Sequence, residues 1–197
     1  MNLFTKVKNQ FIKIKRAIIF LEDPRKFHAR IKKLQKQGMK IGTNVTVLHD
    51  TIFDSSRPWL IEIGNNVTFA PRCHILTHDA SMDIFLKKTR IGKVKILDNC
   101  FFGAGTVILP NITIGPNVII GAGSVVTKNI PENSVYTGNP ARLVSSLDEF
   151  LAKHQQLSDK HPCYPYPDYH VKCITADQAK HMSSELNNTF GYSVRKK

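Results

Sequence analysis

One histidine in the sequence is well placed to carry chemistry: His78, in the tripeptide Thr77-His78-Asp79. An imidazole has an unperturbed pKa of about 6.5, so near neutral pH it is largely neutral and can accept a proton. A hydroxyl group is too weak an acid to attack a carbonyl carbon at neutral pH without such a base. We therefore predict that His78 acts as a general base, with Asp79, Asp83 or a backbone carbonyl holding its ring in one tautomer.

The second half of the sequence repeats with a period of six. From Ile96, an apolar residue leads each block, and a small, β-branched or otherwise apolar residue follows four places later. A period of six fits neither an α-helix nor a simple strand. It predicts a triangular coil of very short strands, in which three blocks complete one turn. Glycines and asparagine-containing pairs are expected at its corners. The leading residues are Ile96, Phe102, Ile108, Ile114, Ile120 and Val126.

The repeat begins at Ile41 and is broken twice. The block FDSSRPWL, from Phe53, contains an extra pair of residues that shifts the phase. Between His78 and Arg90 the repeat disappears, which predicts a loop that leaves the coil. Insertions on one face of a repeat protein are a usual place for a binding site.

Three regions are expected. Residues 1–40 contain a basic amphipathic helix over residues 1–21 and a second helix from Pro24 to Gly38. Residues 41–142 form the coil. Residues 143–197 comprise a helix over residues 143–157 that covers the last turn of the coil, and a tail from residue 158. The first helix is expected either to pack on the coil or a neighbouring subunit, or to attach to an anionic membrane surface.

From about Ile41 to Arg142, the chain resembles the hexapeptide-repeat acyltransferases. The resemblance lies in the six-residue repeat, the Thr77-His78-Asp79 tripeptide and the closing segment GAGSVVTKNIPENSVYTGNPAR. More narrowly, the chain resembles the maltose, galactoside and exopolysaccharide O-acetyltransferases. This resemblance implies a mainly β fold, a left-handed parallel β-helix with N-terminal helices and a C-terminal helix and tail. It also implies acetyl-CoA as co-substrate and no metal.

The resemblance further implies where acetyl-CoA and its acceptor bind. The site would lie between the subunits of a homotrimer, and the backbone N–H near Ala104 would face the negative oxygen of the tetrahedral intermediate. Small residues would let the pantetheine arm approach, and basic residues would meet the 3′-phosphate. The implied coenzyme-binding residues are Gly103, Ala104, Gly105, Ala122, Thr127, Lys128, Pro140 and Arg142. The implied acceptor-binding residues are Asp54, with His49, Arg57 and Trp59 nearby.

The charge, the apolar runs and the cysteines of the sequence limit which partners and which compartment the protein can be expected to have. The net charge of +13 favours an anionic partner, but no nucleic-acid-binding motif accompanies it, so no nucleic-acid partner is expected. No run of about 18 apolar residues occurs that would span a membrane. The four cysteines form no CxxC pair, and Cys73 and Cys100 fall at inward positions of the repeat. They are therefore expected to be core residues in a reducing compartment, the cytoplasm.

The favoured function is acetylation of a sugar hydroxyl, in a surface polysaccharide or its precursor. An antibiotic or an amino sugar is the alternative acceptor. A zinc enzyme using His49, His74 and His78 is a weaker alternative, because His74 and His78 are only four residues apart. A coil that has lost its chemistry would have no need of His78 or of a basic coenzyme-binding end.

Overall fold

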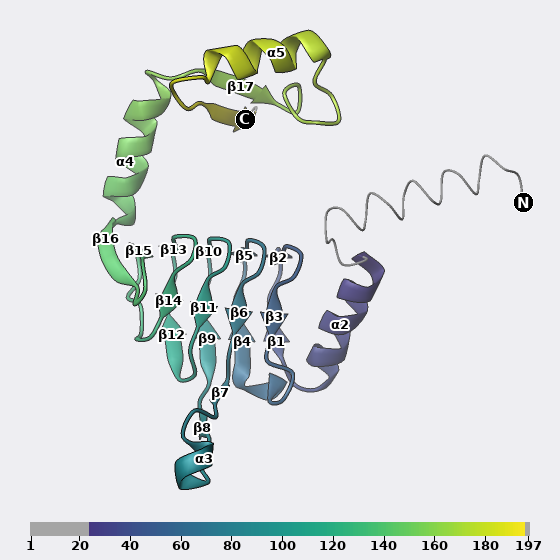
Figure 1. Ribbon diagram of the computed structural model, residues 1–197, viewed down its shortest axis with the longest axis vertical. Helices are drawn as coiled ribbons and strands as arrows, with labels where there is room; N and C mark the ends of the chain where they lie inside the picture. The colour runs from purple at the N-terminus through teal and green to yellow at the C-terminus, as the bar shows by residue number, and fades with distance from the viewer. Residues whose placement is uncertain (1–23, 196–197) are drawn as a thin grey trace, which may run out of the picture. The chain divides into compact units, whose positions relative to one another are not determined.

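The computed structural model describes residues 24–195, and the basic helix expected over residues 1–21 lies outside them. The chain divides into two compact units, the first ending at Leu147 and the second beginning at Asp148. The first unit contains the coil (Figure 1), and residue 78 falls within it.

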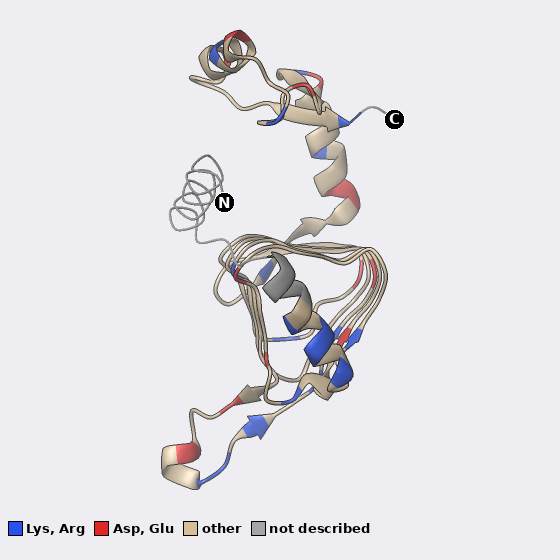
Figure 2. Ribbon diagram, turned by 90° about the vertical axis from the view of Figure 1, so that its right-hand side faces the viewer, with Lys and Arg blue, Asp and Glu red and all other residues tan. Residues whose placement is uncertain are grey.

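The first unit is a triangular coil with three sides, here called A, B and C, whose strands pair in parallel except for the last strand of side B (Figure 2). Side A contains β1 (Lys40–Ile41), β4 (Ile61–Ile63), β9 (Val94–Ile96) and β12 (Ile112–Ile114). Side B contains β2 (Thr46–Val47), β5 (Thr68–Phe69), β10 (Cys100–Phe102), β13 (Val118–Ile120), β15 (Ser134–Thr137) and β16 (Arg142–Ser146). Side C contains β3 (Ile52–Phe53), β6 (His74–Ile75), β11 (Val107–Ile108) and β14 (Val125–Val126).

The two inward positions of each block form the core, as the six-residue period predicts. All six leading residues from Ile96 to Val126 are at most 1% exposed. They stack in register from turn to turn; Phe69 and Phe102, for example, have ring centroids 4.9 Å apart. Residues with a hydroxyl or a thiol can also occupy the second inward position. Their side chains can donate a hydrogen bond to the backbone carbonyl three residues earlier. Thr106 and Ser124 donate to Gly103 and Gly121 in this way.

Cys73 and Cys100 occupy the same second inward position, so the prediction that they are core residues is confirmed. Their thiols approach the backbone carbonyls of Ala70 and Gly115. Burial raises the pKa of each thiol to about 11. Neither sulfur is therefore a reactive thiolate at neutral pH. Cys163 and Cys173, in contrast, are exposed, and all four cysteines are free.

Asparagine turns the corner between sides A and B. Five asparagines there have φ angles between 52° and 58°, a left-handed conformation that asparagine tolerates better than most residues. Their side-chain amides hydrogen-bond from turn to turn at 2.8–3.0 Å, which ties successive turns together. The five are Asn44, Asn66, Asn99, Asn117 and Asn133.

Gly105, with a φ of 72°, turns a corner of the coil as expected, but three other corner glycines have a different role. Gly103 does not need a positive φ; instead, a Cβ there would lie 2.3 Å from the backbone nitrogen of Ala122 on the next turn. Gly115 and Gly121 are restricted in the same way by the turn above. These glycines therefore allow successive turns to stack closely.

Two insertions make the early turns longer. Asparagines at equivalent positions are 22 and 33 residues apart across the first two turns, but 18 and 16 apart across the next two. The first insertion, expected to be a pair of residues, is longer than that and contains the 3-10 helix η1 (Pro58–Leu60). The second is a hairpin that leaves the coil as predicted; it consists of β7 (His78–Asp79), α3 (Asp83–Leu86) and the antiparallel strand β8 (Arg90–Ile91).

The two ends of the coil are covered differently. At the N-terminal end, helix α2 (Pro24–Lys36) contributes Leu34 to the core and ends before Gly38, whose φ of +104° suits glycine. At the C-terminal end, residues 143–146 were expected to be helical but belong to β16. This strand pairs antiparallel with β15 and satisfies the open edge of side B. The local helical spacing was overridden because an unpaired strand edge was available.

The second unit begins within helix α4 (Leu147–Ser158). The sequence predicted no definite structure for the tail. In the structure it forms β17 (Cys163–Tyr166) and β18 (Tyr192–Arg195), which pair in parallel, and helix α5 (Ala176–Glu185) connects them along the chain. Tyr164 is buried and donates a hydrogen bond to Glu185 at 3.0 Å. Throughout residues 24–195, no helix has the length and apolar character that crossing a bilayer requires.

Candidate active site

His78 lies where the chain leaves side C to form the hairpin. It is the first residue of β7 and pairs with Ile91 of β8. The preceding Thr77 is fully buried, whereas the His78 side chain is 37% exposed. The imidazole is therefore fixed by the coil at its backbone and remains accessible from outside. This is the placement that a base acting on a bound substrate requires.

The carboxylate of Asp54 orients the imidazole from the turn below. Its Oδ2 lies 2.5 Å from Nδ1 of His78. The same oxygen accepts hydrogen bonds from the Thr77 backbone N–H at 3.0 Å and from the Thr77 hydroxyl at 2.6 Å. Oδ1 accepts from the backbone N–H and hydroxyl of Ser56, at 2.9 and 2.6 Å. Because an ionised carboxylate only accepts, Nδ1 carries the proton and Nε2 is left as the basic nitrogen.

Asp54 is held in its ionised form although it is buried. Burial alone would raise the pKa of this carboxyl group, but the hydrogen bonds from Ser56, Thr77 and His78 outweigh it and hold the pKa well below its ordinary value. The carboxylate is only 6% exposed. A permanent negative charge thus faces Nδ1, where it favours the imidazolium that forms when Nε2 accepts a proton.

This arrangement differs from the one expected around His78. Asp79 was one of the groups expected to orient His78, but its carboxylate accepts from the Ser81 backbone N–H at 3.0 Å and lies 3.5 Å from Arg90. Asp54 was expected to contact the acceptor, and in the structure both of its oxygens accept hydrogen bonds from protein donors. Sequence reasoning did not assign a role to Ser56 or Thr77. The polar run around residue 55 and the tripeptide containing Thr77 were the available signals.

The other predicted acceptor residues are divided between two places. Arg57 donates to the Ser56 hydroxyl at 3.2 Å, so it lies beside the Asp54 network. Trp59 is 56% exposed in η1 and packs against Gly38 at the coil edge. His49 lies at the corner between sides B and C, with Nδ1 3.1 Å from Asp50. His78 leaves from the corner between sides C and A, so one chain does not bring His49 and His78 together.

The predicted coenzyme-binding residues also lie at two corners of the coil. Gly103, Ala104, Gly105 and Ala122 form the corner between sides B and C, where the Gly123 N–H donates to the Ala104 carbonyl. Thr127 and Lys128 follow β14 at the corner between sides C and A, two turns beyond His78. Pro140 and Arg142 lie in the closing segment, where the Ala141 N–H donates to Val125 of side C.

The backbone donors at the first of these corners are available to a ligand. Within the described part of the chain, the N–H groups of Ala104 and Ala122 donate to no protein acceptor, and both residues are exposed. Successive turns therefore present N–H groups in a column. This suits an amide-bearing arm or a developing negative oxygen.

The histidines are not arranged for zinc. His74 faces outward on side C, where Nδ1 lies 3.1 Å from the Arg72 carbonyl. Across residues 24–195, no group of three or more His, Cys, Asp or Glu side chains is arranged to hold a metal ion.

The fold and the site define a hexapeptide-repeat coil with a histidine–aspartate pair at its edge, and comparisons with known proteins agree. Residues 93–128 match the family model described as bacterial transferase hexapeptide (six repeats). Protein CapG of Staphylococcus aureus is 39% identical over 132 residues, which cover 64% of this chain and 77% of that protein. The chain therefore belongs to the hexapeptide-repeat transferase family, and it is an acyltransferase with a left-handed parallel β-helix.

Two further relatives indicate the kind of acyl transfer in this family. Galactoside O-acetyltransferase of Lactococcus lactis is 36% identical over 115 residues, which cover 57% of this chain and 52% of that enzyme. The chain thus spans about half the length of this relative. A hexapeptide-repeat acetyltransferase of Vibrio cholerae, solved in complex with acetyl-CoA, has a TM-score of 0.52 and 27% identity, covering 56% of this chain and 61% of that one.

Proposed function

We propose that the chain is an acetyl-CoA-dependent O-acetyltransferase that acts on a sugar hydroxyl, with His78 as general base. The observation that carries this proposal is the Asp54–His78 contact, which fixes the tautomer and leaves Nε2 as the basic nitrogen of a partly exposed side chain. The acetyl-CoA bound by the Vibrio cholerae protein and the name of the Lactococcus lactis enzyme support the donor and the acceptor class.

In the proposed reaction, Nε2 of His78 removes the proton from the acceptor hydroxyl as its oxygen attacks the thioester carbonyl. The new negative oxygen is stabilised by a backbone N–H, for which that of Ala104 is available. Asp54 stabilises the imidazolium, which then delivers its proton to the departing thiolate of coenzyme A. The products are an O-acetyl ester and free coenzyme A.

An active site formed between two copies of the chain would bring together the corner that contains Ala104 and the corner that contains His78. Within one chain, Ala104 and His78 are at different corners, so neither corner alone has both the base and the free N–H column. Parallel packing of two coils would place one copy's column opposite the other copy's His78. Three copies arranged in this way form a closed ring, a homotrimer with three equivalent sites.

The outward residues of the three sides support this assembly. Side A presents Lys40, Glu62 and Lys95 in register, a charged row suited to water. Side C presents the apolar Ile52, Val107 and Val125, with His74 between them. Side B also presents the apolar Phe101 and Ile119 in register, so apolar outward positions lie on sides B and C, as is typical of an interface. The copies are therefore expected to leave side A in solvent.

The acceptor is proposed to be a surface polysaccharide or its precursor, with an antibiotic or an amino sugar as the alternative. The high positive charge of the chain suits an anionic acceptor or a membrane-linked one. The enzyme would then work in the cytoplasm, at or near the inner face of the membrane.

The test is an assay of acetyl transfer from acetyl-CoA to a panel of sugars. Release of the free thiol measures the rate, and mass spectrometry identifies the product. His78→Ala is expected to reduce the rate by about 10²–10⁴-fold, the usual contribution of a positioned base. Asp98→Asn, at the corner between sides A and B, is the matched control and should keep its rate. Full activity in His78→Ala, or a monomer by light scattering, would remove the proposal.

A further inference from the structure

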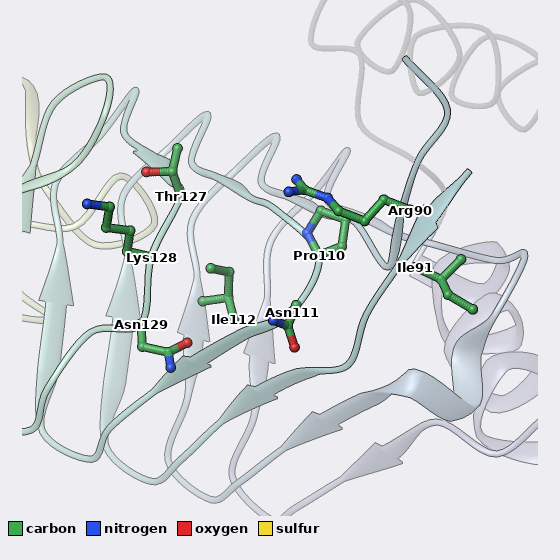
Figure 3. A pocket seen from close by; sticks show the side chains of 8 residues that line it. All are labelled: Arg90, Ile91, Pro110, Asn111, Ile112, Thr127, Lys128 and Asn129. Atoms are coloured by element: carbon green, nitrogen blue, oxygen red, sulfur yellow. The ribbon is translucent and has the colours of Figure 1, made fainter. Parts of the chain in front are cut away.

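A pocket of about 540 Å³ lies beside the predicted base, on the same edge of the coil (Figure 3). The end of the hairpin forms one wall of this pocket, and the corner segments of the two turns beyond His78 form the others. Its lining residues are Arg90, Ile91, Pro110, Asn111, Ile112, Thr127, Lys128 and Asn129.

The lining of the pocket is positively charged. Arg90 and Lys128 contribute two cations, Asn111, Thr127 and Asn129 contribute neutral polar groups, and no carboxylate lines the pocket. Figure 3 shows the Arg90 side chain reaching from the hairpin over Pro110, toward the turn that contains Thr127. Two cations with polar neighbours and no acidic lining residue favour a negatively charged ligand.

The wall that contains Arg90 is fixed relative to His78. Ile91 is the pairing partner of His78 in the hairpin. The next residue, Gly92, donates its N–H to the Thr77 carbonyl at 3.0 Å. A Cβ at Gly92 would lie 2.5 Å from the backbone nitrogen of Asn111, so the strand is pressed directly onto the coil. Arg90 is therefore held beside the base by backbone contacts.

The ion pair that Arg90 already makes is weak. Its Nη2 lies 3.5 Å from Oδ2 of Asp79, and the two side chains are 52% and 33% exposed. An exposed pair of this kind contributes little to stability, because water screens it. A phosphate or carboxylate in the pocket can compete with it, because a bidentate contact to a guanidinium is stronger than an exposed single contact.

We propose that Arg90, together with Lys128, forms an anion-binding pocket that holds a phosphate or carboxylate group next to His78. Family resemblance implied Lys128 as a coenzyme-phosphate contact, but it implied nothing for Arg90. The inference rests on the proposed function and gives the site a charge preference. The anion has two sources, a phosphate of the coenzyme or an acidic group of the acceptor. The position of Arg90 beside the base favours the acceptor, because the pantetheine arm separates the thioester from the phosphates.

The test is calorimetric titration of the full chain with two probes, coenzyme A and glucuronate. Arg90→Gln should weaken binding of one probe by about 10-fold or more, the usual effect of losing one charged hydrogen-bonding group. Arg90→Lys, which retains the charge, should keep part of that affinity. Lys88→Gln is the matched control, since Lys88 is an exposed cation on the same hairpin that does not line the pocket.

Weaker binding of coenzyme A by Arg90→Gln assigns the pocket to the coenzyme, and weaker binding of glucuronate assigns it to the acceptor. Either result supports the proposal. It is overturned if Arg90→Gln binds both probes as the unaltered chain does, or if Lys88→Gln loses as much affinity. Because binding needs no turnover, these outcomes are independent of whether His78→Ala abolishes transfer.

Discussion

Replacing Asp54 by asparagine would separate the charge of this side chain from its shape. Asparagine has one acceptor oxygen, so its amide group must replace one of the two carboxylate oxygens. Oδ2 accepts from Thr77 and His78, whereas Oδ1 accepts only from Ser56. The least costly arrangement keeps the oxygen on the Thr77 side and leaves the Ser56 backbone N–H without an acceptor.

The expected loss of stability is about 1–3 kcal/mol, the range for losing hydrogen bonds to a charged group. Ser56 is an exposed residue, so water can replace part of the hydrogen bond that its backbone N–H loses. The remaining hydrogen bonds also weaken, because bonds to a charged acceptor are roughly twice as strong as neutral ones. The rate of acetyl transfer should fall by about 10²-fold or more, since the imidazolium loses its counter-charge. The apparent affinity for acetyl-CoA should change much less.

The difference in stability should depend on pH in one direction. The pKa of Asp54 in the folded chain lies below its ordinary value of about 3.9, so the folded state binds this proton more weakly than the unfolded state. The stabilisation from the carboxylate is therefore complete above that ordinary value. It is lost as pH falls below it toward the lower folded pKa. Asp54→Asn cannot titrate, so the stability gap should be constant from pH 8 to about 5 and shrink below about 4.

Urea unfolding at fixed protein concentration, together with initial rates of acetyl transfer, measures both effects. Asp98→Asn is the matched control, because Asp98 also accepts a backbone hydrogen bond, from Asn65 at 2.7 Å, but lies at another corner. It should lose stability and keep its rate. The charge of Asp54 has no such role if Asp54→Asn retains its rate within about threefold while His78→Ala is inactive, or if the stability gap does not change between pH 7 and pH 3.

Two further predictions concern the coil. Gly103→Ala should lower the free energy of unfolding by about 2–3 kcal/mol, because its Cβ would meet the Ala122 backbone. Gly105→Ala has open space around its Cβ, so it should lose only about 1–2 kcal/mol from the left-handed backbone conformation. Thermal melting that shows the reverse order would contradict close stacking at Gly103. A thiol reagent at pH 8 should modify the two exposed cysteines quickly and the two buried ones only after unfolding. Rapid reaction of all four in the folded chain would show that the coil opens readily.

The six-residue period determined the coil because it is a local property of the chain. An inward position recurs every six residues, and burial at Phe102, Ile108 and Ile114 follows from side-chain type alone. The same periodicity located the hairpin after His78, since a repeat that stops indicates a chain that leaves the coil. These features need no knowledge of how the turns stack.

The partner of His78 was decided by the tertiary structure. Asp54 and His78 are 24 residues apart, and their contact depends on the length of an irregular first turn that the six-residue count could not measure. The strand at residues 143–146 likewise formed because the edge of side B needed a partner, against the local helical spacing. Contacts between turns are set by insertion lengths and open edges. The sequence therefore determined which residues face inward. The stacking of turns determined that the carboxylate of Asp54 contacts His78 and that Arg90 of the hairpin lies beside it.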